Sequence, residues 1–160
     1  MSKTPIVAFL QNQWFKNPER ARRTYAMFGD ERRHELNARF LFAGCTTGRN
    51  LQKTFGPELC DRIIWEETSR EVGDRPSSIF PADMTWMCNV MRRFKPAIVL
   101  TFGKHAEAAF GVLREQFVFD GMWLKAMHPA ARHPDLLASL RETERQLRVA
   151  MLALAERGEG

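Results

Sequence analysis

Cysteine is scarce in this sequence. Three are present, Cys45, Cys60 and Cys88, and they lie far apart along the chain. An odd number of widely spaced cysteines argues against a disulfide framework and against a compact cysteine-based metal site. We therefore expect the cysteines to serve as small apolar side chains of a cytoplasmic protein, and we expect no metal ion and no cofactor.

Long apolar runs are missing as well. None is long enough to cross a bilayer, and the residues before the apolar run 6–10 are too few for a secretory signal. Repeats and low-complexity segments are also absent. For a chain of 160 residues, these absences predict a single domain over residues 1–160, with a core of ordinary size and no membrane partner. We expect a monomer.

Positive charge is concentrated in the first third of a chain whose net charge is +5. Arginine outnumbers lysine there, and a guanidinium binds phosphate with two parallel hydrogen bonds. The basic residues of this part are Arg20, Arg22, Arg23, Arg32, Arg33, Arg39, Arg49 and Lys53. This distribution indicates a polyanionic partner such as nucleic acid.

Apolar runs and helix-start signals alternate along the chain. The apolar runs predict buried strands at 6–10, 40–43, 63–65, 97–101 and in a run ending near 127. Helical spacing and capping residues predict helices over 18–28, after Asp30, from Thr47 to Lys53, from Asp83 to Phe94, over 104–114 and from Pro134 onward. This alternation is typical of the α/β class. It predicts a three-layer α/β/α sandwich with a mainly parallel central sheet.

The carboxyl ends of parallel strands meet at one edge of a sheet, and ligands of α/β proteins bind there. The segment after the first predicted strand offers hydrogen-bonding amides beside flat rings, in the residues Gln11, Asn12, Gln13, Trp14 and Phe15. Two carboxylates, Glu66 and Glu67, follow the strand 63–65. Both segments are therefore candidates for a binding or catalytic site.

Two further segments at this edge carry positive charge. In the first, Thr47 and Arg49 begin a helix that also contains Lys53, and a helix N-terminus attracts phosphate. The second is His128-Pro129-Ala130-Ala131-Arg132-His133-Pro134. Its prolines stiffen a loop that offers an acid–base group, His128, and a long cation, Arg132.

This second stretch resembles the C-terminal motif of the uracil-DNA glycosylase superfamily, which reads His-Pro-Ser-Pro-Arg-Asn-Pro in the single-strand-selective monofunctional branch. The segment Phe9-Leu10-Gln11-Asn12-Gln13-Trp14 is similar to that branch's other motif, Gly-Met-Asn-Pro-Gly, and places Asn12 on the motif asparagine. Residues 98–106 are similar to the family's apolar strand, glycine and helix. The order and spacing of the strands extend the resemblance over nearly the whole chain, which implies the family's glycosylase fold.

The resemblance implies an enzyme that flips a nucleotide out of DNA and releases uracil or a modified pyrimidine by water attack at C1′. His128 would donate a hydrogen bond to the departing base, and Asn12 would hold the water. The implied base pocket comprises Gln11, Trp14, Phe15, Phe42, Glu66 and Glu67. Phe42 is preferred over Phe15 and Phe40 as the stacking ring, because it ends a predicted strand. The DNA-binding candidates are Thr47, Arg49, Lys53, Ala130, Arg132 and His133, with Arg132 as the wedge that fills the gap left by the flipped base.

The chain also departs from the family pattern. Leu10, Gln13 and Trp14 replace Gly, Pro and Gly of the first motif, and Ala130 replaces a serine of the last. Glu66 and Glu67 stand where family members place an asparagine that reads the pyrimidine. A carboxylate accepts a hydrogen bond from an exocyclic amine and offers uracil O4 no donor unless it is protonated. These departures favour a modified pyrimidine over plain uracil as the substrate.

Two other functions are compatible with the sequence. One is a nucleic-acid-binding protein that uses the same fold, single- or double-stranded DNA being its partner, without base release. The other is a hydrolase of free nucleosides or nucleotides in which Glu66 or Glu67 is the catalytic carboxylate.

Overall fold

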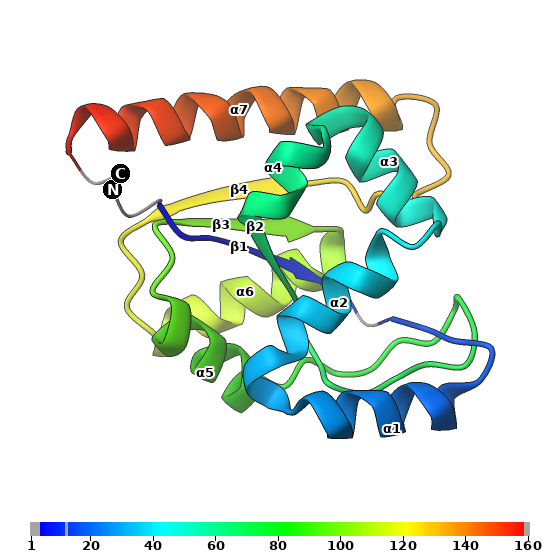
Figure 1. Ribbon diagram of the computed structural model, residues 1–160. Coiled ribbons are helices and arrows are strands. Elements are labelled where there is room, and N and C mark those ends of the chain that lie inside the picture. Colours follow the sequence, from blue (N-terminus) through cyan, green and yellow to red (C-terminus); the bar gives the residue numbers. More distant parts are fainter. Residues whose placement is uncertain (1–3, 12, 159–160) are drawn as a thin grey trace.

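The structure is a computed structural model that describes residues 4–11 and 13–158. Within them, one sheet has the strand order β2-β1-β3-β4, and all of its pairs are parallel (Figure 1). The strands are β1 (Ile6–Leu10), β2 (Ile63–Glu67), β3 (Ile98–Phe102) and β4 (Met122–Ala126). The helices are α1 (Pro18–Phe28), the short 3-10 helix η1 (Asp30–Arg32), α2 (Arg33–Leu41), α3 (Thr46–Phe55), α4 (Pro57–Arg62), α5 (Met84–Phe94), α6 (Lys104–Gln116) and α7 (Leu136–Glu156). The predicted α/β class and parallel three-layer sandwich are confirmed.

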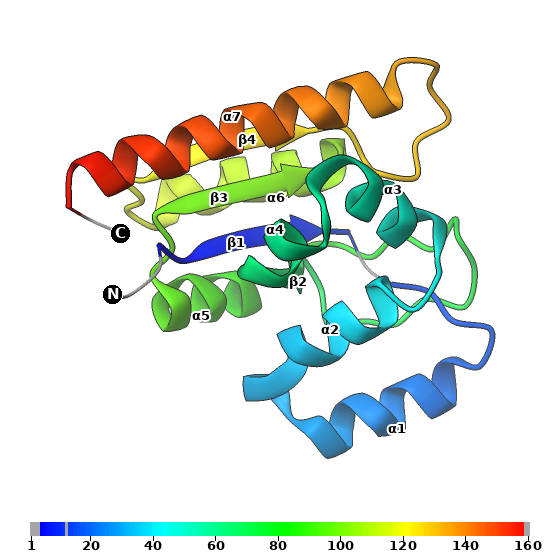
Figure 2. The ribbon, with the colours of Figure 1, turned by 45° about the horizontal axis from the view of Figure 1, so that its top comes forward.

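Helices cover both faces of the sheet (Figure 2). On one face, Leu51 of α3, Leu59 of α4 and Leu140 of α7 pack against the sheet in one apolar cluster. On the other face, Met87 of α5 and Phe110 of α6 form a second cluster. The two central strands are therefore buried on both sides, which explains why β1 is wholly apolar and β3 is apolar except for Thr101. No helix in the described part of the chain is both long and apolar enough to span a bilayer.

The strand predicted at Phe40–Ala43 is wrong. Phe40 and Leu41 are the last residues of α2, and Phe42 is its C-terminal cap. This end of the helix lies between two apolar clusters. Leu41 is buried against the sheet, whereas Phe40 packs beside α1. A helix that buries residues on two sides needs consecutive apolar residues, and such a short run is indistinguishable from a buried strand by periodicity.

Two boundaries near the predicted site also differ from expectation. The helix expected to start at Thr47 starts at Thr46 instead, with Cys45 as its N-cap. Glu66 and Glu67, which were expected in a loop, are the last two residues of β2, and both are buried. The other predicted strands, the cap at Asp83 and the turn at Gly103 are confirmed, with boundaries shifted by one or two residues.

The close approach of α3 to the end of α2 depends on Gly48. A Cβ atom at this position would lie 1.7 Å from the carbonyl oxygen of Leu41, which belongs to the backbone and cannot turn aside. We predict that Gly48→Ala lowers the free energy of unfolding by about 3 kcal/mol, because α3 must move away from α2. Chemical denaturation of the purified variant measures this loss.

The control is Gly111→Ala in the interior of α6. A Cβ atom there would meet the Trp123 ring at 3.8 Å, an ordinary contact. We expect this variant to be as stable as the wild type or more stable by up to about 1 kcal/mol, since alanine favours the helix. Equal stability of the two variants would contradict the proposed close packing at Gly48.

Candidate functional site

Four segments meet at the carboxyl edge of the sheet, because all four strands run in the same direction. Gln11 follows β1, Glu67 ends β2, Gly103 follows β3, and His128 comes two residues after β4. Three of the four segments singled out from the sequence, those of Gln11, Glu67 and His128, thus lie at the same edge, with β1 and β3 between the ends of β2 and β4. The fourth, at the start of α3, is joined to the His128 loop by a hydrogen bond. Asn12, the expected water-holding residue, lies outside the described residues.

His128 is held in one tautomer by its own loop. Its Nδ1 accepts a hydrogen bond from the backbone N–H of Ala130 at 3.1 Å. The neutral ring therefore carries its proton on Nε2, which makes Nε2 a hydrogen-bond donor. Burial lowers the pKa of His128 below its ordinary value, which further favours the neutral form. The side chain predicted to be catalytic is thus a neutral donor.

The position of His128 is fixed by two contacts with other elements. A Cβ atom at Gly103, which has φ +91°, would lie 3.2 Å from the His128 Cβ, so the histidine packs directly on the glycine backbone. Asn50 of α3 donates a hydrogen bond from Nδ2 to the Pro129 carbonyl at 2.7 Å. Sequence reasoning missed Asn50 as a site residue, because its partner is 79 positions away and no local pattern marks the pair.

The predicted DNA-binding residues lie on the two segments that the Asn50 hydrogen bond joins. Thr47, Arg49 and Lys53 belong to α3, and Ala130, Arg132 and His133 belong to the His128 loop. Thr47 is half-buried and the other five are exposed. The Arg49 guanidinium is held over the start of α3 by the Gly44 carbonyl and by the Thr46 hydroxyl. The Nδ1 of His133 accepts the N–H of Asp135, and that contact orders the loop before α7.

Glu66 is part of a buried polar cluster that was not predicted. The Nδ2 of Asn37 donates to the Glu66 Oε1 at 3.2 Å and to the Trp65 carbonyl at 3.0 Å. The Tyr25 hydroxyl donates in turn to the Asn37 Oδ1 at 2.7 Å. Asn37 and Glu66 are each 1% exposed. Tyr25 and Asn37 escaped sequence reasoning because polar residues on helices ordinarily face solvent.

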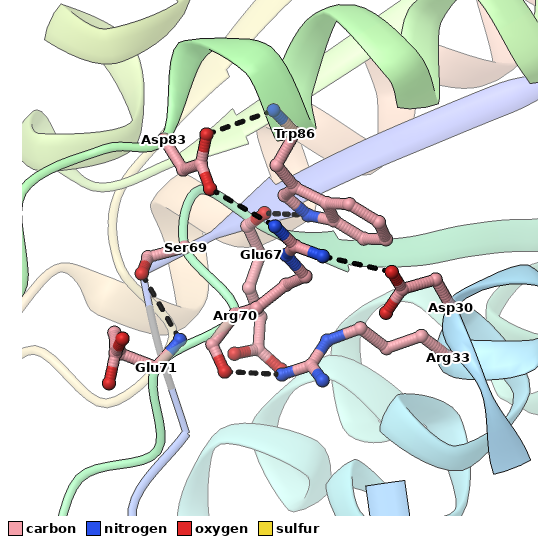
Figure 3. A network of polar contacts seen from close by, with 8 residues as sticks. All are labelled: Asp30, Arg33, Glu67, Ser69, Arg70, Glu71, Asp83 and Trp86. Carbon is pink, nitrogen blue, oxygen red and sulfur yellow. Dashed lines mark hydrogen bonds and ion pairs between the residues drawn. The ribbon is translucent and has the colours of Figure 1, made fainter. Parts of the chain in front are cut away.

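The two carboxyl oxygens of Glu67 differ in their hydrogen bonding within the described structure. Its Oε2 accepts the backbone N–H of Gln13 at 3.2 Å, whereas no hydrogen-bond partner of its buried Oε1 is found among the described residues. Arg33 lies nearby (Figure 3), with its guanidinium 4.0 Å from the Tyr25 ring centroid and one N–H donated to the Arg70 carbonyl at 3.0 Å. The Nε of Arg33 is also buried without a partner in the described structure.

Burial raises the pKa of both carboxyl groups. Desolvation, reinforced for Glu66 by the charge of Glu67, raises the pKa of Glu66 to about 8. Desolvation raises the pKa of Glu67 to about 7, against the opposing effect of the Arg33 charge. Near neutral pH, Glu67 therefore exists both as a carboxylate that accepts hydrogen bonds and as an acid that donates one. The protonated form, which we expected from the sequence to be the exception, is therefore populated near neutral pH.

The aromatic candidates do not gather in one place. Phe42 packs edge-on against Trp65, with ring centroids 5.6 Å apart, and is part of the core under α3 and α7. The reason for preferring it as the stacking ring, a position at the end of a strand, no longer holds. Phe15 and Phe40 form an edge-to-face pair at 4.7 Å beside α1. Trp14 is 43% exposed, and its backbone pairs with that of Gly73 in an isolated parallel β-bridge.

Comparison with known proteins adds no identification. No protein-family model matches the chain, and no curated protein or solved structure matches it either. Among residues 4–11 and 13–158, no group of three or more His, Cys, Asp or Glu side chains has an arrangement that holds a metal ion. The geometry of the sheet edge is therefore the basis for a functional proposal.

The buried carboxyl at Glu66 predicts a pH-dependent stability. Its pKa is raised from 4.5 to about 8 in the folded protein, so the folded state binds the proton more tightly than the unfolded state does. The free energy of unfolding should then fall as the pH rises from about 5 to 8, by on the order of a few kcal/mol. Glu66→Gln, which keeps the acceptor for Asn37 without the charge, should reduce this fall and be more stable than the wild type at pH 8.

Denaturation curves measured between pH 5 and 8 test this prediction. Burial lowers the pKa of His34 and His128, which destabilises the folded state on the acid side, and comparing variant with wild type cancels that effect. Glu31→Gln, at an exposed carboxyl, is the matched control and should follow the wild type. Parallel curves for Glu66→Gln and wild type would show that Glu66 is not the titrating group.

Proposed function

We propose that this protein cleaves N-glycosidic bonds in DNA. The observation that carries the proposal is His128, a neutral imidazole whose donor Nε2 is fixed by the Ala130 hydrogen bond at the carboxyl edge of a parallel sheet. A base that leaves a sugar takes the bonding electrons with it and accumulates negative charge on its oxygen. A fixed donor at that oxygen stabilises the transition state more than the ground state.

More specifically, we propose a monofunctional DNA glycosylase of the uracil-DNA glycosylase type. The resemblance of the His128 loop and of the segment around Asn12 supports this assignment, and so does the parallel sheet with both segments after its strands. In the proposed reaction a nucleotide flips out of the stack, His128 donates to the departing base, and Asn12 holds the water that attacks C1′. Arg132 fills the gap left in the duplex, and the basic residues of α3 bind phosphates.

The substrate we propose is a modified pyrimidine. Glu67 supports this choice, because its Oε1 has no partner within the described structure and its pKa is raised to about 7. As a carboxylate it accepts a hydrogen bond from the exocyclic amine of a cytosine-type base. Above that pKa the carboxylate offers the O4 of plain uracil no donor, so base release assayed above pH 7 should favour the modified pyrimidine.

His128→Ala tests the proposed chemistry. We expect single-turnover base release to fall by a factor of ~10² or more, the usual effect of removing one transition-state donor. His34→Ala is the control for the loss of an imidazole, because His34 packs against Phe94 and has no role in the proposed reaction, and it should release base at close to the wild-type rate. The wild-type rate should also fall in acid, because protonation of Nδ1 breaks its hydrogen bond with Ala130. Burial lowers the pKa of His128, so this fall should occur at a lower pH than for an ordinary histidine. A normal rate for His128→Ala would remove the catalytic assignment.

A panel of oligonucleotides tests the substrate. Each carries one uracil, one hydroxymethyluracil or one modified cytosine, and alkali-induced strand scission reports base release. We expect scission with a modified pyrimidine and little with uracil. Scission with uracil alone would contradict the role given to Glu67. Tight binding without scission at excess protein would indicate a binding protein, and base release from free nucleosides that is insensitive to salt would indicate a nucleoside hydrolase.

A further inference from the structure

A hollow lies between α1 and α2, away from His128. It has a volume of about 590 Å³, and we call it the aromatic cleft. Its lining residues are Phe15, Lys16, Asn17, Arg20, Ala21, Thr24, Phe28, Leu36, Arg39, Phe40 and Ala43. On each helix they recur at intervals of three and four, so that one face of α1 and one face of α2 form the two walls.

The walls are built from partly exposed aromatic rings. Phe15 and Phe40 pack edge to face with their centroids 4.7 Å apart. The Arg39 guanidinium lies 5.2 Å from the centroid of the Phe28 ring. All three rings are half-buried and line the cleft. Half-exposed rings beside a guanidinium form a stacking surface for another flat ring.

The rim of the cleft carries charge of one sign. Lys16, Arg20 and Arg39 are exposed and form no ion pair within the described structure, and no acidic residue lines the cleft. The acidic side chains of the same two helices are engaged elsewhere, Glu19 with Arg22 and Glu35 with Arg32. The cleft is therefore complementary to a ligand that is flat and apolar in its middle and anionic at its ends.

We propose that the aromatic cleft binds an unpaired base of single-stranded DNA, with the neighbouring phosphates on Lys16, Arg20 and Arg39. The cations stand on both walls, so a strand that crosses the cleft meets positive charge before and after the base. This combination of a basic groove with stacking rings is how proteins bind single strands without reading their sequence. A paired base in a duplex has no free face to offer.

The cleft begins in the segment that also forms the candidate active site. Phe15 follows Gln13 by two residues. The backbone N–H of Phe15 donates to the Gly73 carbonyl, and that of Gln13 donates to the Glu67 carboxyl. A strand that reached from the sheet edge to the aromatic cleft would follow this segment. The proposal extends the DNA binding of the proposed function, but it concerns affinity, and it stands or falls apart from catalysis.

Fluorescence anisotropy with a labelled short oligothymidylate tests the cleft. The double variant Arg20→Gln/Arg39→Gln should bind about ten-fold more weakly at low salt, and its log–log salt dependence should be less steep by about 1.4, the effect of two lost phosphate contacts on a single strand. Phe28→Leu should weaken binding about five-fold or more through lost stacking while retaining the salt dependence. Thermal unfolding checks that each variant is folded.

The matched control is Arg141→Gln/Arg157→Gln. It removes the same charge from exposed positions in and beside α7, which lies at the opposite side of the molecule from α1 (Figure 1). It should bind with nearly wild-type affinity. Equal weakening of both double variants would overturn the proposal, because general charge rather than the cleft would then explain binding.

Two further measurements separate the competing explanations. If the cleft variants bind oligothymidylate normally but lose binding to vesicles containing phosphatidylglycerol or to an acidic amphipathic peptide, the cleft is not a DNA site. Base release at saturating DNA should be unchanged by the cleft variants, whereas His128→Ala should slow release by the same factor of ~10² or more and leave oligothymidylate binding intact. Failure of catalysis and failure of the cleft proposal therefore give different results.

Discussion

Asn37 connects the elements on which the candidate site depends. From α2 its side-chain amide donates hydrogen bonds to the Trp65 carbonyl and the Glu66 carboxyl in β2. Its side-chain oxygen accepts one from the Tyr25 hydroxyl in α1. Its backbone carbonyl accepts from the Gln13 side chain in the segment after β1. Asn37 is 1% exposed, so water cannot replace a lost partner. Displacing one of these elements would leave a buried polar group without a hydrogen bond, which costs about 1–3 kcal/mol of folding free energy per group. The segment after β1 and the end of β2 are thereby fixed relative to each other.

Burying the two carboxyl groups at the end of β2 lowers the stability of the folded state, because each must give up its hydration. Apolar side chains at Glu66 and Glu67 would fill the same space between helix and sheet without any cost of desolvation. The chain instead surrounds them with Asn37, Arg33 and Tyr25, and still leaves one oxygen of Glu67 without a partner in the described structure. Positions that break the local rules of burial are where function is expected. This is the reason for placing Glu67, rather than an aromatic ring, at the centre of the substrate argument.

Much of the fold follows from local patterns, whereas the site does not. The runs 6–10 and 97–101 are predictable as strands because both faces of β1 and β3 are covered, and the Asp83 cap and the Gly103 turn are local signals. The error at Phe40–Ala43 arises because a helix packed on two sides carries the composition of a strand. The contacts from Asn50 to Pro129 and from Asn37 to Glu66 join distant segments. Only packing reveals such pairs, and only packing turns surface-like Arg33 and Tyr25 into buried residues.

The strand order has a consequence for how the protein is made. β1 is the first strand of the chain, yet it lies in the middle of the sheet, with Ile6 aligned to Ile63 on one side and to Ile98 on the other. During synthesis β1 is made before both of its partner strands, β2 and β3. Pairing of strands that are far apart in the sequence is slow, because a long loop must be closed first. β4 arrives last and brings His128 with it. A partly folded chain that lacks β4 does not hold both halves of the edge, so the candidate site is complete only once β4 has joined the sheet.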